Sequence, residues 1–510
     1  MKKANLKRIL EIIPGVMSWS IILSSILLFK FNPVMAAIAL IVYLIYWSCR
    51  LFYMSTLLFM AHHRMLSKKS VDWYKLCEAS ESDKSLAQIV HVVLYTIYKE
   101  PESILIESLN AVKTGNYPKE NIIVVLAGEE RGEGTREKLE NLKTKFQGDF
   151  KDILLSIHPS GIQGEIPCKG ANATYAAKRV KTYLEQKTID FGNVIISCFD
   201  ADTCPDRNYF SCLTYHFLTN PNRYRTGYQP LPIYSNNIFT APAFARVIEM
   251  GSTFWQLIES MKANAFVTFA SYGMSFKTLV DVDYWPVNLV SDDSLIYWKC
   301  FVKFNGDYTT YSLEVPVFMD IAVGKNILDT ILVQYKQKRR WAWGVETFVF
   351  LGMHLWGNRS IPLSLKVKKV FQILDNHINW ATWAILISFI TPLLLCWGKW
   401  VRQDSLVFLN LTYINSTLVN SFTLILLLCI FIGKEFLPPR PPKVSRFIYV
   451  SFILQWFLTP LVSAFLGSIP ALDAQTRLMI QKPLVFDPTP KQRLTEGPEE
   501  KVPGNLRRKK

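Results

Sequence analysis

Two aspartates in the middle of the chain have the spacing of a metal-binding pair. Asp200 and Asp202 stand one residue apart in the segment FDADTCPD, directly after an apolar run. Two carboxylates this close repel each other unless a cation lies between them. Oxygen ligands of this kind suit Mg²⁺ or Mn²⁺, which can also bridge a diphosphate. The alternative is a pair of aspartates that caps a turn, because D-x-D is common in loops.

Two further segments combine residue types that bind anions or move protons. In KGAN, Lys169 could pair with a phosphate, and the glycine and helix start that follow it favour an anion. In VSDDSL, Asp292 and Asp293 could cap a helix or, in a sharper interpretation, remove a proton from a sugar hydroxyl. The alternatives are a surface lysine beside a helix start and an ordinary helix cap.

A fourth segment, QYKQKRRWAWG, joins an amide, a guanidinium and an indole in Gln337, Arg340 and Trp341. A guanidinium matches the geometry of phosphate oxygens, and an indole can stack on the face of a sugar. The alternative is a basic amphipathic helix on a membrane surface.

Alternating strands and helices must position these residues. Continuous apolar runs predict strands at 91–98, 121–127, 152–158 and 194–199, with helices at 102–112, 135–146 and 171–185. This order predicts an α/β fold with a mostly parallel sheet and helices on both faces. Such sheets bind ligands at the carboxyl ends of their strands, where the D-x-D pair lies.

Both ends of the chain are apolar enough to enter a membrane. Half of the 510 residues are hydrophobic, yet 19% are charged, which is too polar for a bundle made only of membrane helices. Apolar runs predict five membrane spans, at 12–31, 34–60, 380–397, 418–432 and 447–466. No uncharged run between residues 60 and 380 is long enough to span, so we expect one soluble domain there.

The distribution of the net charge of +16 predicts which side of the membrane the soluble domain occupies. The start, MKKANLKR, and the loop GKEFLPPRPPKVSR are basic, which favours the cytoplasm for both and therefore for the domain. Five crossings would leave the tail outside, yet it ends in NLRRKK. We therefore expect either a re-entrant last segment, interrupted by Pro460, or one further crossing, with the tail in the cytoplasm. Anionic lipid explains the cations better than nucleic acid does, so no nucleic-acid partner is expected.

The nine cysteines contain no C-x-x-C pair, and a cytosolic domain predicts free thiols.

The motifs, taken in order, resemble those of the family 2 processive glycosyltransferases, which include cellulose, chitin and hyaluronan synthases. The resemblance rests on D-x-D, the acidic pair and Q-x-x-R-W within residues 90–345, flanked by membrane helices. It implies a GT-A-like fold and an inverting, metal-dependent transfer of sugar from a nucleotide-sugar, by default a UDP-sugar, to a growing polysaccharide, coupled to export. The alternatives are single addition of sugar to a lipid carrier and a non-catalytic membrane protein with a nucleotide-sugar-binding domain.

The resemblance assigns four residues to the nucleotide. Asp200 and Asp202 match the D-x-D that holds Mg²⁺ or Mn²⁺ and the diphosphate. Lys169 and Asn172 match the K-x-x-N element beside the nucleotide.

Five further residues are assigned to the transfer itself. Asp293 matches the final aspartate of the T-E-D motif, the proposed catalytic base, and Asp292 precedes it in the same motif. Gln337, Arg340 and Trp341 match Q-x-x-R-W, with Arg340 near the diphosphate and Trp341 near the acceptor sugar.

Two departures from the family pattern concern the nucleotide. The usual proline–aromatic–N/E motif after the first strand is represented here by Thr96, Tyr98 and Glu100, with threonine in place of proline. The second strand usually ends in an aspartate that contacts the nucleobase, whereas this chain has LAGEER. Glu129 or Glu130 would take its place with one more methylene, so the sequence leaves the nucleobase open.

These interpretations divide the chain into an N-terminal transmembrane hairpin (1–61), a cytoplasmic glycosyltransferase domain (62–345), interfacial or linker helices (346–379), C-terminal transmembrane helices (380–470) and a basic tail (471–510). We expect an integral protein of a bacterial inner membrane, in contact with lipids, a nucleotide-sugar donor and a glycan or lipid-linked acceptor. The sequence names no export or accessory subunit.

Overall fold

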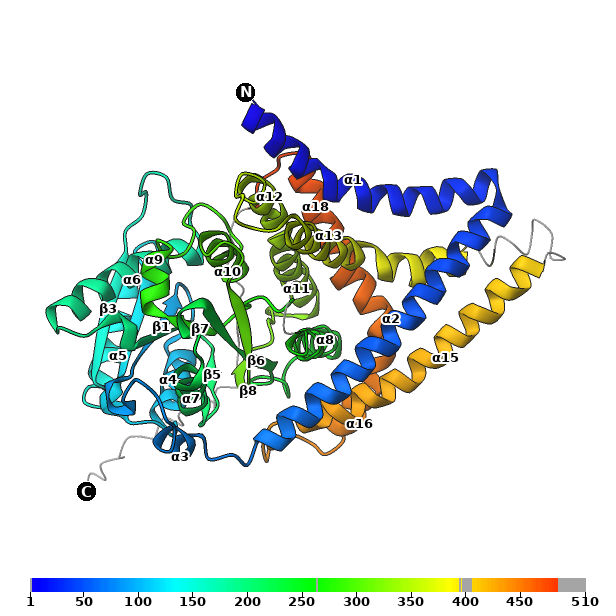
Figure 1. The fold of residues 1–510 in the computed structure, drawn as a ribbon. Helices are drawn as coiled ribbons and strands as arrows, with labels where there is room; N and C mark the ends of the chain where they lie inside the picture. Colours follow the sequence, from blue (N-terminus) through cyan, green and yellow to red (C-terminus); the bar gives the residue numbers. More distant parts are fainter. Residues whose placement is uncertain (1, 263–264, 394–395, 397–405, 485–510) are drawn as a thin grey trace, which may run out of the picture.

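An eight-stranded mixed sheet forms the centre of the soluble part of the molecule (Figure 1). The structure is a computed structural model that describes residues 2–262, 265–393, 396 and 406–484. The strand order is β3-β2-β1-β4-β7-β6-β8-β5, with four parallel and three antiparallel pairings. The strands are β1 Val90–Ile97, β2 Ile122–Glu129, β3 Asp152–His158, β4 Val194–Asp200, β5 Cys204–Pro205, β6 Thr226–Tyr234, β7 Tyr272–Ser275 and β8 Thr309–Met319.

Both faces of the sheet are covered by helices. Along β1, Val92 and Leu94 pack into one core with α6 (Lys169–Gln186) and α10 (Asp292–Lys303). Val93 and Tyr95 point the other way, because side chains alternate along a strand. That second core contains α4 (Glu102–Lys113), α5 (Thr135–Lys145) and α7 (Tyr209–Thr219). The predicted α/β class, with a mostly parallel sheet and helices on both faces, is confirmed.

The first half of the sheet agrees with the sequence prediction, whereas β5 to β8 were not predicted. Each of the first four strands begins and ends within two residues of its predicted range. Strand β6 contains Pro230 and Pro232, and proline normally argues against a strand inside a sheet. Strand β7 has only four residues, too few for a periodic signal.

The carboxyl ends of six strands meet at one edge of the sheet. Strands β1 to β4 are parallel, β7 is antiparallel to β4, and β6 is antiparallel to β7, so β6 and its parallel neighbour β8 run in the direction of β4. The residues that end β4, β6 and β8 therefore lie along the same edge, and they are Asp200, Tyr234 and Met319.

The remaining long helices surround this edge or extend away from the sheet. Figure 1 shows α2 and α15 side by side, and α1 and α2 meeting at the end far from the sheet. The long helices are α1 Lys2–Phe31, α2 Pro33–Lys68, α8 Ala243–Ser260, α11 Ile327–Ala342, α13 Leu363–Ile385 and α15 Leu406–Glu435. The shorter helices are α3 Trp73–Glu78, α9 Phe276–Asp281, α12 Glu346–His354, α16 Ile448–Leu454, α17 Thr459–Val462 and α18 Ile469–Met479.

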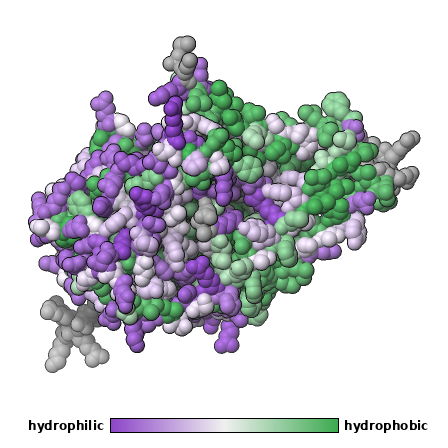
Figure 2. Space-filling view, in the orientation of Figure 1, coloured by the Kyte–Doolittle hydropathy of each residue, from purple (hydrophilic) through white to green (hydrophobic). Residues whose placement is uncertain are grey.

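Four helices in the described part of the chain are long and apolar enough to cross a membrane. They are Lys3–Phe31, Pro33–Lys68, Leu409–Glu435 and the continuous helical segment Ile448–Met479. Apolar side chains gather over the α1, α2 and α15 end of the molecule, whereas the sheet end is mostly polar (Figure 2). The predicted span 380–397 begins within α13, but residues 394–395 and 397 lie outside the described residues, as does the tail from 485 onward.

Both ends of the segment Ile448–Met479 lie beside the sheet-proximal ends of α1 and α2. At its start, Phe452 and Trp456 pack in one cluster with Leu57 and Ala61 near the end of α2. At its end, Arg8 of α1 donates a hydrogen bond to the carbonyl of Met479. The turn between α1 and α2 lies at the end of the hairpin away from the sheet (Figure 1). The segment Ile448–Met479 therefore begins and ends near the open end of the hairpin, which is the end closer to the sheet.

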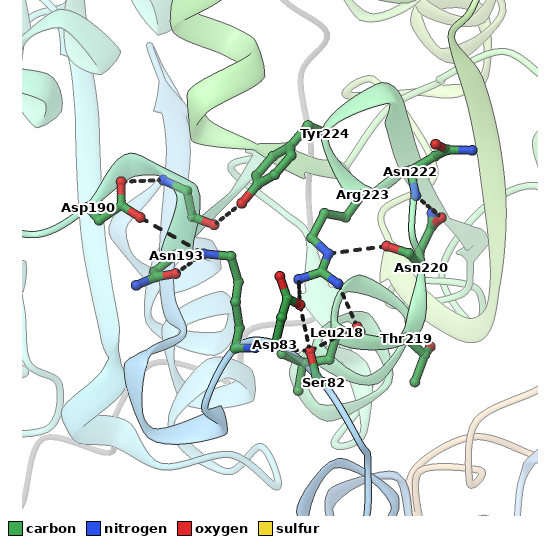
Figure 3. Close-up of polar contacts among 12 residues, drawn as sticks. Ser82, Asp83, Asp190, Asn193, Leu218, Thr219, Asn220, Asn222, Arg223 and Tyr224 are labelled. Atoms are coloured by element: carbon green, nitrogen blue, oxygen red, sulfur yellow. Dashed lines mark hydrogen bonds and ion pairs between the residues drawn. The ribbon is translucent and has the colours of Figure 1, made fainter.

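The link from α3 into β1 is held by a cluster of polar contacts at the opposite edge of the sheet (Figure 3). The Arg223 guanidinium pairs with Asp83 at 2.7 Å and donates to the backbone carbonyls of Leu218 and Asn220 at 3.0 and 3.1 Å. Tyr224 donates to the carbonyl of Gly192 at 3.2 Å, just before β4. These bonds join the segment that follows α2 and α3 to the end of α7 and the entry of β4.

Candidate active site

A cleft of about 1220 Å³, measured out to its open mouth, lies at the carboxyl edge of the sheet. All the site residues predicted from the sequence line it except Glu130. That residue is exposed and accepts hydrogen bonds from the backbone and hydroxyl of Ser160 instead. The predicted residues in the cleft are Thr96, Tyr98, Glu100, Glu129, Lys169, Asn172, Asp200, Asp202, Asp292, Asp293, Gln337, Arg340 and Trp341.

Lys169 stands at the centre of the acidic part of the cleft. Its ammonium nitrogen lies 2.7 Å from Asp200 Oδ1, and donates to the two carboxylate oxygens of Asp293 at 2.9 and 3.1 Å. Burial alone would lower the pKa of Lys169, but the two carboxylates raise it well above its usual value. Lys169 is therefore a fixed cation that joins the D-x-D pair to the acidic pair.

Gly170 and Asn172 bring the start of α6 against the neighbouring elements. A Cβ atom on Gly170 would lie 2.4 Å from the carbonyl oxygen of Pro286 and 2.9 Å from the Cβ of Asp292. The glycine thus permits a close approach, but of protein backbone and side chain rather than of a phosphate. Asn172 donates to the carbonyl of Ala127 in β2 at 2.8 Å, which leaves its buried Oδ1 without a hydrogen-bond partner among the described residues.

Asp292 and Asp293 form the first turn of α10, as the helix-cap interpretation expected for their position. Burial raises the pKa of both carboxyls, most strongly that of Asp292, where the neighbouring Asp293 adds to the effect. For Asp293, Lys169 opposes the increase. The Glu346 carboxylate fixes the backbone just before the pair, accepting from the N–H groups of Val290 and Ser291 at 3.0 and 2.9 Å.

Asp200 and Asp202 differ in exposure. The Asp200 side chain is about one quarter exposed, whereas Asp202 is fully buried and its Oδ2 accepts the backbone N–H of Asp320 at 2.7 Å. Asp320 itself lines the cleft directly after β8. Seven acidic but only three basic side chains line the cleft, so its chemistry fits a bound divalent cation.

Helix α11 presents the Q-x-x-R-W residues to the other side of the cleft. Trp341 lies between the rings of Tyr234 and Phe269, with centroid distances of 5.9 and 5.4 Å. The Arg340 guanidinium is near enough to Asp293 to favour the ionised form of that carboxyl. Lys338, one turn before Ala342 and fully buried, forms an ion pair with Glu249 of α8 at 2.7 Å. Aromatic rings and a cation thus define this wall.

The end of the cleft at β1 and β2 carries a network of opposite charges. The Arg131 Nε lies 3.0 Å from Glu129 Oε2, and the Arg131 guanidinium stacks over Tyr98 at 4.5 Å. His158, at the end of β3, lies 3.5 Å from Glu129 and 2.9 Å from Glu165. Hydrogen bonding to Glu129 raises the pKa of His158, although burial opposes this. Glu129, rather than Glu130, therefore occupies the strand-end position.

Several lining residues were missed by the sequence reasoning. Arg131, Tyr234, Phe269 and Asp320 all border the cleft. For Tyr234 and Asp320 a signal exists in the sequence, because each comes directly after a largely apolar run, as Asp200 does. That signal identifies a site residue only together with strands β6 and β8, which the sequence does not predict.

The family model described as "Glycosyl transferase family group 2" matches residues 195–462, which is more than half of the chain. The chain belongs to this family. It is therefore a glycosyltransferase, and the GT-A-like fold class predicted from the sequence is confirmed for its α/β domain. The match begins in β4 and extends through α16 into α17, so it includes D-x-D, the acidic pair, Q-x-x-R-W and the apolar helix α15.

Solved structures with a similar arrangement include the mannosyltransferase PcManGT from Pyrobaculum calidifontis in complex with GDP-Man and Mn²⁺. It is 12% identical, with 80% of this chain and 99% of that chain covered at a TM-score of 0.42. Residues 1–349 of S. aureus TarS, in complex with UDP-GlcNAc, are 12% identical, with 59% and 75% covered at a TM-score of 0.38. Among curated proteins, no sequence matches this chain.

Proposed function

We propose that this glycosyltransferase transfers a sugar from a UDP-sugar to a growing polysaccharide at the membrane and passes the product into its membrane helices. The observation that carries the proposal is the position of Trp341. It lines the cleft together with Asp293 and also packs in the apolar cluster that contains Leu57 of α2 and Ile432 of α15. An acceptor sugar stacked on this indole would lie between the carboxylate that activates it and the apolar helices.

The donor would lie along the edge between β1 and β4. The nucleoside would enter beside Tyr98 and Glu129, and the diphosphate would lie near Lys169 and Arg340. Positive groups at this place stabilise the charge that develops on a departing diphosphate. Mg²⁺ or Mn²⁺ held by Asp200 and Asp202 would neutralise further charge on the same group.

Asp293 would accept the proton of the acceptor hydroxyl as that oxygen attacks the anomeric carbon from the face opposite the diphosphate. The Lys169 ammonium opposes the effect of burial and helps to keep Asp293 ionised for this task. A base placed within hydrogen-bond distance of the hydroxyl typically contributes about 10²–10⁴ in rate.

The topology that we propose places the catalytic domain in the cytoplasm of a bacterium and the helices α1, α2 and α15 in the inner membrane. Basic residues at the start of α1 and in the loop after α15 support this side. The segment Ile448–Met479 would be re-entrant, because both of its ends lie beside the domain. Its contacts with the domain also support this, since Arg246 of α8 donates to Gln455 and Ser451, at 2.6 Å in both cases.

The test is a screen of UDP release from the full chain in detergent, across common UDP-sugars with Mg²⁺ or Mn²⁺, followed by sizing of radiolabelled product. We expect release with one donor, dependence on the divalent ion, and a product of many sugars. A labelled lipid that carries one sugar would instead support single addition to a lipid carrier. Absence of metal-dependent UDP release with every UDP-sugar would contradict the proposed transfer from a UDP-sugar.

A further inference from the structure

A second group of metal-ligating side chains lies outside the cleft, between α7 and β8. Cys212 and His216 stand one helical turn apart on α7 and therefore share one face of the helix. That face packs against β8 at Glu314. The Cys212 sulfur, one His216 ring nitrogen and one Glu314 carboxylate oxygen all lie within 4.8 Å of one another. This is the one such group found among the described residues.

The polar atoms of this group have unmet bonding capacity. His216 Nε2 and Glu314 Oε2 lie 3.5 Å apart, the distance of a weak ion pair when the imidazole is protonated, and neither atom has a hydrogen bond of normal geometry within the part of the chain that the structure describes. Glu314 is nine-tenths buried, so water does not readily satisfy this oxygen. A single long contact satisfies two buried polar atoms only in part, and a cation between them would satisfy both.

We propose that Cys212, His216 and Glu314 bind one Zn²⁺ ion as a structural site, separate from the divalent ion of the catalytic cleft.

The identity of the ion follows from the ligands. A thiolate, an imidazole and a carboxylate are the ligand types of zinc, whereas Mg²⁺ prefers oxygen alone. Zinc–ligand bonds of about 2.0–2.3 Å in a tetrahedron place the ligand atoms roughly 3.3–3.8 Å apart. The 3.5 Å between His216 Nε2 and Glu314 Oε2 lies within this range. The Cys212 sulfur lies within 4.8 Å of the other two ligand atoms, so it would need to move toward them by about 1 Å at most.

The surroundings hold the ligands in place. The His216 ring packs against the rings of Tyr311 and Trp73, with centroid distances of 4.5 and 5.2 Å. The second oxygen of Glu314 is paired with Arg64 of α2. Metal ligands are commonly oriented by such outer contacts. Glu314 and Arg64 also border a small pocket between α2, α8 and β8.

Binding would couple a proton to the metal. Burial raises the pKa of the Cys212 thiol well above its usual value, so the thiol is protonated without a metal. When the Zn–S bond forms, the S–H bond breaks and its proton passes to water, with no change of oxidation state. The site would tie α7 to β8, and through Arg64 to α2.

Metal analysis of the full chain in detergent tests this proposal. The protein is purified without chelator or polyhistidine tag, incubated with zinc, dialysed against zinc-free buffer and analysed by mass spectrometry for metal content. We expect about one zinc per chain, and loss of that zinc in the Cys212→Ala and His216→Ala variants. Cys300→Ala is the matched control, because Cys300 is also fully buried but lies in α10. Asp200→Asn should keep its zinc, since it alters only the catalytic cleft.

Cobalt gives a second measurement that does not depend on the stability of the variants. Replacement of zinc by Co²⁺ in the wild-type chain should produce a thiolate-to-cobalt charge-transfer band, and zinc should raise the Tm of the chelator-treated protein where Mg²⁺ does not. Folded wild-type protein that retains well below one zinc per chain and shows no thiolate band would overturn the proposal. Full retention of zinc by folded Cys212→Ala would overturn it equally.

Discussion

The Lys338 ammonium nitrogen lies 3.5 Å from the centre of the Trp341 indole ring. Both residues belong to α11, and Glu249 holds the lysine from α8 with an ion pair that is almost completely buried. A desolvated cation over an indole contributes about 2 kcal/mol. Lys338 is therefore a positioning residue, which fixes the ring that we propose as the acceptor platform.

Replacement of Lys338 should weaken the use of acceptor and leave donor binding intact. Because Lys338→Met alone would leave Glu249 buried without a partner, we expect the clearest result from the double variant Lys338→Met/Glu249→Gln. Acceptor kcat/KM should fall about tenfold, which corresponds to ~1.4 kcal/mol. UDP affinity, measured by calorimetry, should not change. Lys336→Met is the control, because Lys336 is exposed on the same helix. An equal loss in the control would contradict the role of the buried cation.

The same lysine predicts an alkaline limit to activity. Burial lowers the pKa of Lys338 from 10.5 to about 8, although Glu249 opposes the shift. The cation over Trp341 should therefore be lost as the pH rises through about 8, and sugar transfer should fall there. Lys338→Arg keeps its charge, so its pH–rate profile should extend further into alkali. Identical profiles for the two proteins would exclude Lys338 as the titrating group.

Loss of the proton from Lys338 affects stability and activity in opposite directions as the pH rises. Between about pH 8 and 10.5 the unfolded chain keeps the proton on Lys338, whereas the folded chain has lost it. The unfolded state thus binds more protons, and this group makes the free energy of unfolding increase with pH across that range. Denaturant titrations of the wild type and the Lys338→Met/Glu249→Gln variant at both ends of the range measure the difference.

Substitution of Gly170 should disturb the cleft through packing. A Cβ at this position would meet the Pro286 carbonyl oxygen at 2.4 Å and the Asp292 Cβ at 2.9 Å, and neither is the far end of a flexible side chain that could move away. We expect Gly170→Ala to lower the free energy of unfolding by about 1–3 kcal/mol and to reduce transfer, because the shift moves the start of α10. Gly251→Ala on α8 is the matched control, since its Cβ would meet no atom within 4 Å. Equal stability of the two variants would refute this account.

The two aspartates of α10 should respond differently to removal of charge. Asp293→Asn removes the proposed base, so transfer should fall by about 10²–10⁴ while UDP binding remains. Asp292 is buried, and burial together with the neighbouring Asp293 raises its pKa, so the neutral form is favoured more strongly at Asp292 than at Asp293. Asn is close in shape to the neutral acid, and Asp292→Asn should keep most of its activity. Radiolabelled transfer assays on the two variants distinguish these roles. A greater loss of transfer with Asp292→Asn than with Asp293→Asn would identify Asp292 as the base instead.

The sequence allowed the cleft to be predicted better than the sheet that forms it. The motifs around Asp200, Asp293 and Arg340 could be placed because each joins charged side chains to a recognisable strand end or helix start. Strand β6 could not, because Pro230 and Pro232 conceal a buried strand, and Tyr234 at its end cannot be placed without it. Asp320 cannot be placed without β8, which it follows directly. Contacts such as Lys338 with Glu249 link residues 89 positions apart, and no local pattern encodes them.

The position of α18 leads to a prediction about membrane topology. Asp473 of this helix pairs with Arg339 of α11 at 2.9 Å, and Gln481 donates to Glu11 of α1 at 3.2 Å. Neither contact is compatible with a helix that ends on the far side of the membrane from the cleft. A single cysteine placed at Lys482 should therefore react with a membrane-impermeant maleimide from the same side as one placed at Lys7, in intact and inverted vesicles of a variant that lacks Cys49 and Cys396.

A cysteine at Asn32 is the control for that experiment, because Asn32 lies at the turn between α1 and α2. It should react from the opposite side, since the hairpin crosses the membrane before reaching it. The segment Ile448–Met479 is apolar enough to span by composition alone, so labelling of position 482 together with position 32 would show that it crosses. Labelling with position 7 would support a re-entrant segment, whose apolar side chains cover α11 and the ends of α1 and α2 rather than lipid on all sides.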